Sequence, residues 1–281
     1  MPLRKPAYPL VVFAACAAFA SVAVAETPLE RGRYLMNSIV ACGNCHTRQS
    51  PSGPQAGREL AGGTPFVEGF GKSFASNITP DPESGVGRWS DEQLITAIRE
   101  GKRPDGSLIG PPMPIVLYRN LSDRDVRAIV AYMRSVPSIR NLVPKAEYKV
   151  PLPASYGPPV TSVPEVPRQD QVAYGAYLTG PAGHCIECHS TPGPQGAPDF
   201  HGALGAGGMS FTGPWGTSVG RNITPTNLAS WSDAEIRKAI TEGIRPDGTR
   251  LMPPMAYRYY KNITSEDLDA IIAYLRTLPP K

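Results

Sequence analysis

Two pentapeptides decide how this chain folds: Cys42-Gly43-Asn44-Cys45-His46 and Cys185-Ile186-Glu187-Cys188-His189. Both have the pattern C-x-x-C-H, which is the signature of covalent c-type haem attachment. Two thiols about one helical turn apart can form thioethers with the two vinyl groups of a porphyrin, and the neutral imidazole that follows can ligate the iron. The sequence therefore predicts two covalently bound haem c groups, with His46 and His189 as the first axial ligands.

Other interpretations of a C-x-x-C pair fit this chain less well. A thioredoxin-like redox pair does not require the adjacent histidine, and a zinc site usually joins two pairs across a short loop. Here the two pairs begin 143 residues apart. Two disulfides would be the default for four cysteines in an exported protein, but the spacing favours haem attachment. The fifth cysteine, Cys16, lies in an apolar N-terminal stretch.

The chain contains one long internal repeat. From the tryptophans onward, the second copy follows the first at a constant offset of 142 residues. The matching segments are Asn77-Ile78-Thr79-Pro80 with Asn222-Ile223-Thr224-Pro225, Trp89-Ser90-Asp91 with Trp231-Ser232-Asp233, Arg103-Pro104-Asp105-Gly106 with Arg245-Pro246-Asp247-Gly248, and Pro111-Pro112-Met113 with Pro253-Pro254-Met255. We therefore expect two similar domains, residues 26–140 and 170–281, joined by a semi-rigid proline-rich linker, residues 141–169.

The repeat selects one methionine in each copy as the second axial ligand. Met113 and Met255 are equivalent, and each ends a Pro-Pro-Met segment that we expect to be extended, because proline fixes φ and removes an N–H donor. Met252 is the rival ligand for the second haem, but its counterpart in the first copy is Gly110. Met36, Met133 and Met209 fall outside the repeated segment, so we expect them to be packing residues.

Composition and the N-terminal segment indicate a soluble, exported protein. The 281 residues carry 28 Lys+Arg against 24 Asp+Glu, a balance that leaves no basic surface for nucleic acid. Arg4 and Lys5 precede an apolar stretch at residues 10–20, and Ala23-Val24-Ala25 resembles a signal-peptidase site. Residues 1–25 are therefore predicted to be a signal peptide that directs the chain to the periplasm. The alternative is an N-terminal membrane anchor that is not cleaved.

Each copy is expected to be mainly helical, with long irregular loops around its haem. Ser90 with Gln93, and Ser232 with Glu235, form capping boxes at the start of an amphipathic segment that ends at a glycine. A first helix precedes each haem motif. A last helix in each copy is predicted to begin after a capping residue and to end before a proline; these pairs are Ser122 with Pro137 and Thr264 with Pro279.

These motifs together resemble the class I cytochrome c family, in which an N-terminal helix, C-x-x-C-H, a methionine ligand and a C-terminal helix with an aromatic residue follow one another. The aromatic residues here are Tyr132 and Tyr274. The loop motifs are similar to those of cytochrome subunits of periplasmic or membrane-bound alcohol, aldehyde and sugar-acid dehydrogenases. The resemblance implies a mainly α fold with two tandem class I cytochrome c-like domains. Those subunits often carry three haems and a C-terminal membrane helix, whereas this chain has two haem motifs.

The expected function is electron transfer by a dihaem cytochrome that is not itself an enzyme. With histidine and methionine on both irons no site is open to a substrate, and thioether ligation raises the reduction potential. The resemblance implies a dehydrogenase as electron donor and a terminal oxidase or cytochrome as acceptor, and it allows peripheral membrane association. The alternative is a dihaem peroxidase or thiosulfate-oxidising enzyme, which needs one iron with an open or unlike sixth ligand. A ligand sensor would need a displaceable methionine.

Several further residues are candidates for supporting roles. The repeated Asn, Thr and Trp residues are expected either to bond haem propionates or to pack the loops; these are Asn77, Asn222, Thr79, Thr224, Trp89 and Trp231. Pro54 and Pro194 are candidates for the carbonyl that orients each axial imidazole. His184 and His201 are expected to face solvent or a propionate rather than iron.

Overall fold

The computed structural model describes residue 1 and residues 25–50, 53–194, 196–213 and 215–281. The signal peptide predicted for residues 1–25 therefore lies almost wholly outside the described residues. Within the described ranges, no helix is both long enough and apolar enough to span a membrane. Residues 26–140 are called the first half below, and residues 170–281 the second half.

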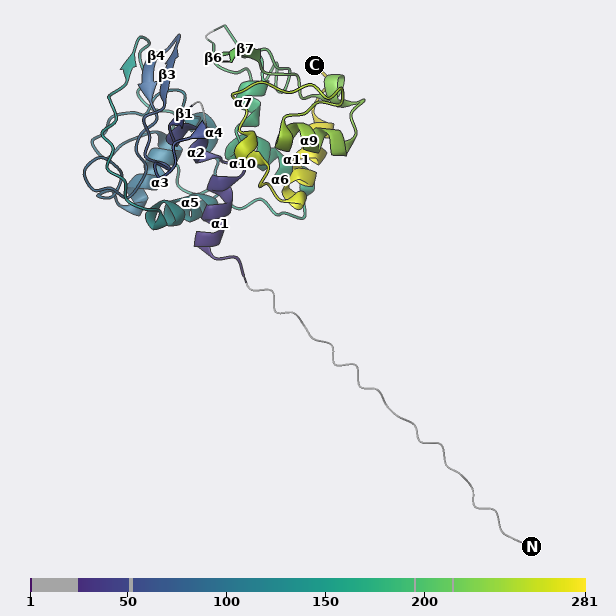
Figure 1. The fold of residues 1–281 in the computed structure, drawn as a ribbon, viewed down its shortest axis with the longest axis horizontal. Helices are drawn as coiled ribbons and strands as arrows, with labels where there is room; N and C mark the ends of the chain where they lie inside the picture. The colour runs from purple at the N-terminus through teal and green to yellow at the C-terminus, as the bar shows by residue number, and fades with distance from the viewer. Residues whose placement is uncertain (2–24, 51–52, 195, 214) are drawn as a thin grey trace.

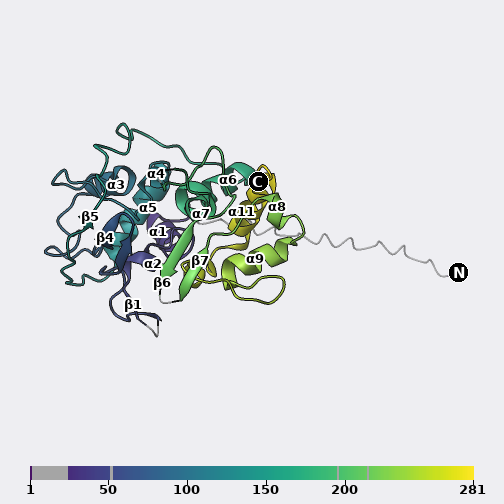
Figure 2. The same ribbon diagram turned by 90° about the horizontal axis from the view of Figure 1, so that it is seen from above.

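Each half is built on two crossed helices. In the first half α1 (Pro28–Asn37) packs against α5 (Asp123–Ser135), and in the second half α6 (Gln171–Tyr177) packs against α11 (Ser265–Thr277). Figure 1 shows the first half in purple to teal on the left and the second half in green to yellow on the right, and Figure 2 shows the same two neighbours from above. Two helical copies in tandem are the arrangement that the repeat predicts.

The middle helices begin and end where their sequences predict. Capping boxes start α3 (Asp91–Glu100) and α9 (Asp233–Glu242): Ser90 accepts from the backbone N–H of Gln93, whose side chain accepts from the Ser90 N–H, and Ser232 makes the same pair of bonds with the residue three positions on. Both helices end at a glycine in the left-handed conformation. The last helices start after their predicted caps, Ser122 and Thr264.

Short helices and small antiparallel strands complete each half. Strands β3, β4 and β5 form one three-stranded sheet, β1 pairs with β2, and β6 pairs with β7. The remaining elements of the first half are α2 (Cys42–His46), β1 (Gln49–Ser50), β2 (Gly53–Pro54), β3 (Pro65–Glu68), β4 (Gly71–Phe74) and α4 (Ile115–Tyr118), followed by β5 (Glu147–Tyr148). Those of the second half are the π-helix η1 (Leu178–Ala182), α7 (Cys185–His189), β6 (Ser210–Gly213), β7 (Gly216–Val219), α8 (Pro225–Leu228) and α10 (Tyr257–Tyr260).

The proline-rich segment at residues 141–169 packs along the first half. Strand β5 extends the β3–β4 hairpin. Farther along, the Tyr156 hydroxyl donates to the carbonyl of Ile109 at 2.8 Å, and the backbone N–H of Val160 donates to Glu100 at 2.9 Å. A segment without long helices or strands is thus held by hydrogen bonds to the surface of the half that precedes it.

One hydrophobic core runs through both halves. Leu35 and Leu178, which occupy equivalent positions in the repeat, are both fully buried and belong to the same cluster. Met36 and Met133 also lie in this core, which confirms that they are packing residues, and Met209 is half-buried. The two halves are therefore joined by apolar contact as well as by the chain.

The helix crossings are expected to tolerate no side chain at their glycines. A Cβ on Gly32 would overlap the backbone carbonyl of Ala128, and one on Gly175 would overlap that of Ala270. Gly32→Ala and Gly175→Ala should each lower the free energy of unfolding by about 1–3 kcal/mol, because the packed helices must separate. Thermal and denaturant unfolding of the haem-loaded protein measures this. Gly69→Ala, at a position with open space, is the control. Wild-type stability of both crossing variants would contradict the close approach.

Candidate functional site

Both C-x-x-C-H motifs form short helices of their own. The motif residues are the whole of α2 and of α7, and each helix begins after a residue in the left-handed conformation, Ala41 (φ 49°) and His184 (φ 41°). One helical turn brings the two thiols of each motif to the same side. None of the four cysteines in the described residues forms a disulfide. The local geometry therefore presents a thiol pair and an imidazole together, as covalent attachment requires.

A backbone carbonyl orients each imidazole. His46 Nδ1 lies 2.8 Å from the carbonyl oxygen of Ser76, and His189 Nδ1 lies 2.6 Å from that of Arg221. A carbonyl only accepts, so Nδ1 carries the proton and Nε2 is the nitrogen that can ligate a metal. Burial lowers the pKa of both imidazoles, which keeps them neutral near pH 7.

The expectation that Pro54 and Pro194 supply these carbonyls is wrong. Ser76 and Arg221 fill the role, each directly before an Asn-Ile-Thr-Pro motif and about 30 residues after its histidine. The loop that follows each haem motif folds back, so a carbonyl distant in sequence reaches the ring. Ser76 and Arg221 are aligned by the repeat, but nothing in their side chains marks a role that their backbone oxygens perform.

All eight predicted attachment and ligand residues line one cavity of about 1330 Å³, to which both halves contribute. They are Cys42, Cys45, His46, Met113, Cys185, Cys188, His189 and Met255. Met252, the rival ligand, also lines this cavity. Each half therefore supplies a thiol pair, an oriented imidazole and a thioether to the same cavity, which is the donor set that a covalently bound haem needs.

The thiols are not those of a reactive redox pair. Burial raises the pKa of Cys42 to about 12 and that of Cys185 to about 12. Dithiol redox sites work in the opposite direction, because a lowered pKa supplies the nucleophilic thiolate. The electrostatics of the site therefore favour attachment chemistry over disulfide exchange.

The Pro-Pro-Met segments differ from their expected shape. Residues 111–113 and 253–255 form turns in place of extended strands, and the bonds Pro111-Pro112 and Pro253-Pro254 are cis. Proline fixes φ but leaves ψ free, so the same residues that stiffen a strand also fit a turn. Both methionines remain half-buried and line the cavity.

The repeated Asn and Thr residues hold their own loops. Asn77 Oδ1 accepts from the Thr79 hydroxyl at 2.7 Å, and Asn77 Nδ2 donates to the Ile139 carbonyl at 2.8 Å. The second copy has the same arrangement, in which Asn222 binds Thr224 and the carbonyl of Lys281. Of the two roles considered, the contacts present here are those of loop packing. The tryptophans, Trp89 and Trp231, line the cavity.

Two aromatic contacts at the cavity were not foreseen. Tyr118 and Tyr260, which the repeat aligns, are buried and line the cavity in both halves. The ring of His184 packs against Tyr118, with centroids 5.9 Å apart and planes at 78°, a contact between the halves that was not predicted. Its partner comes from the other half of the chain, which local sequence does not reveal. His201 is exposed.

Family comparisons match the two halves separately. The family model described as cytochrome c matches residues 172–279, and the one described as cytochrome c oxidase, cbb3-type, subunit III matches residues 27–133. Together they cover both haem motifs.

Three curated relatives are similar along most of the chain. The dihaem c-type cytochrome of Cereibacter sphaeroides is 30% identical over 85% of this chain and 82% of its own length. The fructose dehydrogenase cytochrome subunit of Gluconobacter japonicus is 31% identical over 90% of this chain and 53% of its own length. A nicotinate dehydrogenase subunit of Pseudomonas putida is 32% identical over 89% of this chain and 21% of its own length. The chain thus spans about half or less of these two dehydrogenase subunits.

Replacing Cys185 and Cys188 with serine is expected to give a protein that carries one haem, because a serine hydroxyl forms no thioether with a vinyl group. The mass of the denatured protein measures the result, since a covalently attached haem survives denaturation. The matched variant C42S/C45S should lose the other haem only. Retention of two haems by mass in C185S/C188S would refute the attachment site.

Proposed function

Because the chain belongs to the cytochrome c family, with a cytochrome c match in each half, we propose that it is a dihaem electron carrier whose two irons are both ligated by histidine and methionine. Two covalently bound haem c groups are its cofactors. The observation that carries the proposal is the matched donor set: each half brings a thiol pair, an oriented imidazole and a thioether to one cavity.

The protein residues hold the cofactor and close its coordination sphere. In this proposal Cys42 and Cys45 would anchor the first group, His46 would ligate its iron through Nε2, and Met113 would supply a thioether as the second ligand. Cys185, Cys188, His189 and Met255 do the same in the second half. When bound, each haem supplies a one-electron change between ferrous and ferric iron. An iron ligated by both an imidazole and a thioether would offer no open site to a substrate, and its reduced form would be favoured.

The matched methionines also separate this proposal from the enzymatic alternative. A dihaem peroxidase or thiosulfate-oxidising enzyme needs two irons with unlike ligands, one of which has a coordination position that is free or can become free. Here the two Pro-Pro-Met turns, including their cis bonds, are alike in the two halves, and Met113 and Met255 both line the cavity. Like ligands on both irons support a carrier.

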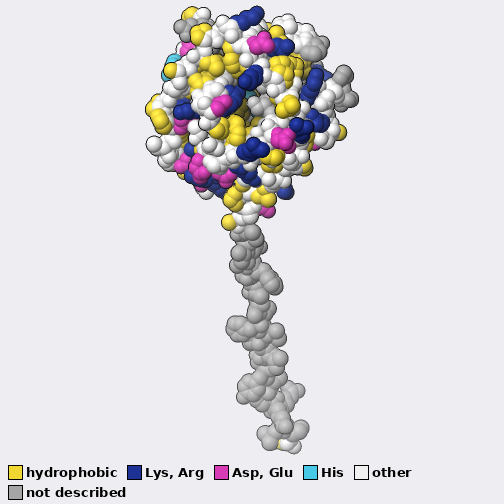
Figure 3. All heavy atoms as spheres, turned by 90° about the vertical axis from the view of Figure 1, so that its left-hand side faces the viewer, with side chains coloured by type: hydrophobic (Ala, Val, Ile, Leu, Met, Phe, Trp, Pro, Cys, Tyr) yellow, Lys and Arg dark blue, Asp and Glu magenta, His cyan; other side chains and the backbone are white. Residues whose placement is uncertain are grey.

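The donor is proposed to be a dehydrogenase. The similar dehydrogenase proteins are named after different substrates, and only the word dehydrogenase is common to their names. We therefore propose a dehydrogenase as the donor and name no substrate for it. A terminal oxidase or another cytochrome would accept the electrons. On the face of the molecule in Figure 3, basic and acidic side chains are interspersed, and this mixed surface suits a protein partner better than a polyanion. We place the protein in the periplasm on the strength of the predicted signal peptide.

Met113→Ala is expected to open one iron to added ligands such as cyanide, to remove part of the far-red absorption band of the oxidised protein, and to lower the potential of that haem. The other haem should be nearly unchanged, and Met255→Ala should show the converse. Redox titration with visible and far-red spectra measures these changes. Met252→Ala, three residues before Met255 in the same cavity wall, is the matched control and should leave both haems intact. Unchanged spectra of both haems in M113A would exclude Met113 as a ligand.

A further inference from the structure

Two reciprocal hydrogen bonds join the halves. The Tyr34 hydroxyl in α1 donates to Asp267 Oδ2 in α11 at 2.7 Å, and the Tyr177 hydroxyl in α6 donates to Asp125 Oδ2 in α5 at 2.7 Å. The repeat aligns Tyr34 with Tyr177 and Asp125 with Asp267. Each half thus offers the same tyrosine and the same carboxylate to its neighbour, as in the self-complementary interface of a symmetric dimer.

Each tyrosine hydroxyl also accepts a hydrogen bond from the other half. The backbone N–H of Thr264 donates to Tyr34 at 3.2 Å, and that of Ser122 donates to Tyr177 at 3.3 Å. Burial, followed by the facing carboxylate, raises the pKa of both tyrosines above the usual range, so the hydroxyls stay protonated and donate at neutral pH. Both hydroxyls therefore have donor and acceptor capacity satisfied across the interface.

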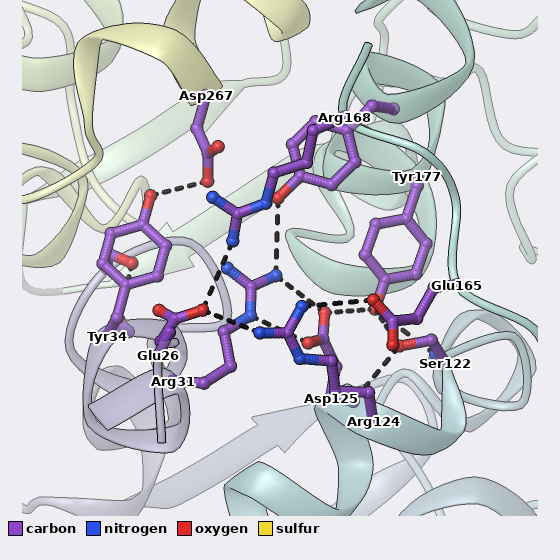
Figure 4. Close-up of polar contacts among 12 residues, drawn as sticks. Glu26, Arg31, Tyr34, Ser122, Arg124, Asp125, Glu165, Arg168, Tyr177 and Asp267 are labelled. Atoms are coloured by element: carbon purple, nitrogen blue, oxygen red, sulfur yellow. Dashed lines mark hydrogen bonds and ion pairs between the residues drawn. The ribbon is translucent and has the colours of Figure 1, made fainter. Parts of the chain in front are cut away.

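One cation breaks the symmetry. Arg31 in α1 binds Asp125 through two parallel bonds, at 2.8 and 2.9 Å, and its guanidinium reaches the Tyr174 hydroxyl at 3.4 Å (Figure 4). Burial alone would raise the pKa of Asp125, but Arg31 holds it below its usual value, so this carboxylate remains an ionised acceptor for Tyr177. Tyr174 is the counterpart of Arg31 in the second copy, so Asp267 has no equivalent arginine.

The same interface brings the two attachment motifs together. Asn44, which lies between the cysteines of the first motif, donates through Nδ2 to the carbonyl of Pro254 at 3.5 Å, directly before Met255. A Cβ on Gly43 would overlap the hydroxyl of Tyr259, so the backbone of the first motif approaches α10 of the second half closely.

Residues in and beside the second motif likewise contact the first half. The His184 ring, directly before the second motif, packs against Tyr118 of the first half. Glu187, inside the second motif, lies near enough to raise the pKa of Cys45, after the larger effect of burial. Both motifs line the same cavity. The side of each site on which its two cysteines lie is called its cysteine edge below. The two cysteine edges therefore face one another across the interface.

We infer that Tyr34 and Tyr177 are positioning residues for electron transfer between the two haems, because their reciprocal hydrogen bonds hold the cysteine edges of the two sites together. The inference rests on the proposed function. In the step itself one electron leaves the ferrous group and reduces the ferric one; no bond forms or breaks and no proton moves. Neither tyrosine lines the cavity, and both act through the placement of the halves.

The test uses the full dihaem protein with Y34F/Y177F. Two measurements are made: the distribution of iron–iron distances in the oxidised protein by pulsed dipolar EPR, and the rate of internal electron equilibration after partial reduction by a photoexcited ruthenium complex. An internal step is first-order and independent of protein concentration, whereas exchange between molecules speeds up with concentration. In wild type we expect a narrow distance distribution and a concentration-independent phase.

In Y34F/Y177F we expect a broadened distance distribution and a several-fold slower internal phase, with the spectra and midpoint potentials of both haems preserved. Y132F is the matched control, because Tyr132 accepts its hydrogen bond from the Asn37 side chain within the first half, and the variant loses a hydroxyl without losing either tyrosine–aspartate bond. The single variant Y34F, which keeps the Arg31-supported bond, serves if the double variant does not fold, and should show a smaller change in the same direction.

Two results would overturn the inference and leave the proposed function standing. One is a wild-type distance distribution and internal rate in Y34F/Y177F; the other is a wild-type protein with no concentration-independent phase although both haems show methionine ligation. Altered haem spectra in the variant would also overturn it, since the tyrosines would then belong to the haem sites. Failure of the proposed function would appear differently, as an open iron in the unaltered protein.

Discussion

The hydrogen bond from the imidazole of each haem motif to a backbone carbonyl is the contact on which both sites depend. It ties the attachment helix to the residue before the Asn-Ile-Thr-Pro loop, at Ser76 and at Arg221. The asparagine of that loop then donates to a carbonyl beyond the last helix of its half, Ile139 or Lys281. Since that last helix crosses the first helix at a glycine, the direction of the imidazole is fixed by the same packing that holds the half together. Loss of packing at the crossing would therefore change the orientation of the imidazole, because these two hydrogen bonds connect the last helix of each half to the ring.

The two copies are alike where the cofactor is held and unlike where the halves meet their surroundings. Caps, loop asparagines, imidazole carbonyls and the Pro-Pro-Met turns are all duplicated. Arg31 has no counterpart, and the segment at residues 141–169 packs along the first half. The buried cation of the first half and the segment packed along that half make the two environments unequal, so identical ligand sets are compatible with different potentials.

The sequence alone predicted the local features but not the contacts between residues that are far apart in the chain. Capping boxes, helix ends and the haem motifs are written within a few consecutive residues. Comparison of the two copies selected Met255 over Met252, and that choice stays a prediction, because both methionines line the cavity. The role of the Ser76 and Arg221 carbonyls was not predicted, because a backbone oxygen has no sequence signature. The contact between His184 and Tyr118 was not predicted because the two residues come from different halves. The reciprocal tyrosines were visible only as helix residues, since pairing across an interface is a property of the folded chain.

The duplication itself explains why such an interface can form. A surface that carries both a donor and its acceptor can bind a copy of itself through two equivalent contacts, and a tandem repeat places that copy at high effective concentration. Tyr34 with Asp267 and Tyr177 with Asp125 are these two contacts. Because each attachment motif begins eight residues after its tyrosine, a symmetric pairing of the halves also brings the two motifs to the same side. The cysteine edges then face one another because of the symmetry, so no dedicated connecting element is needed to bring the two attachment motifs together.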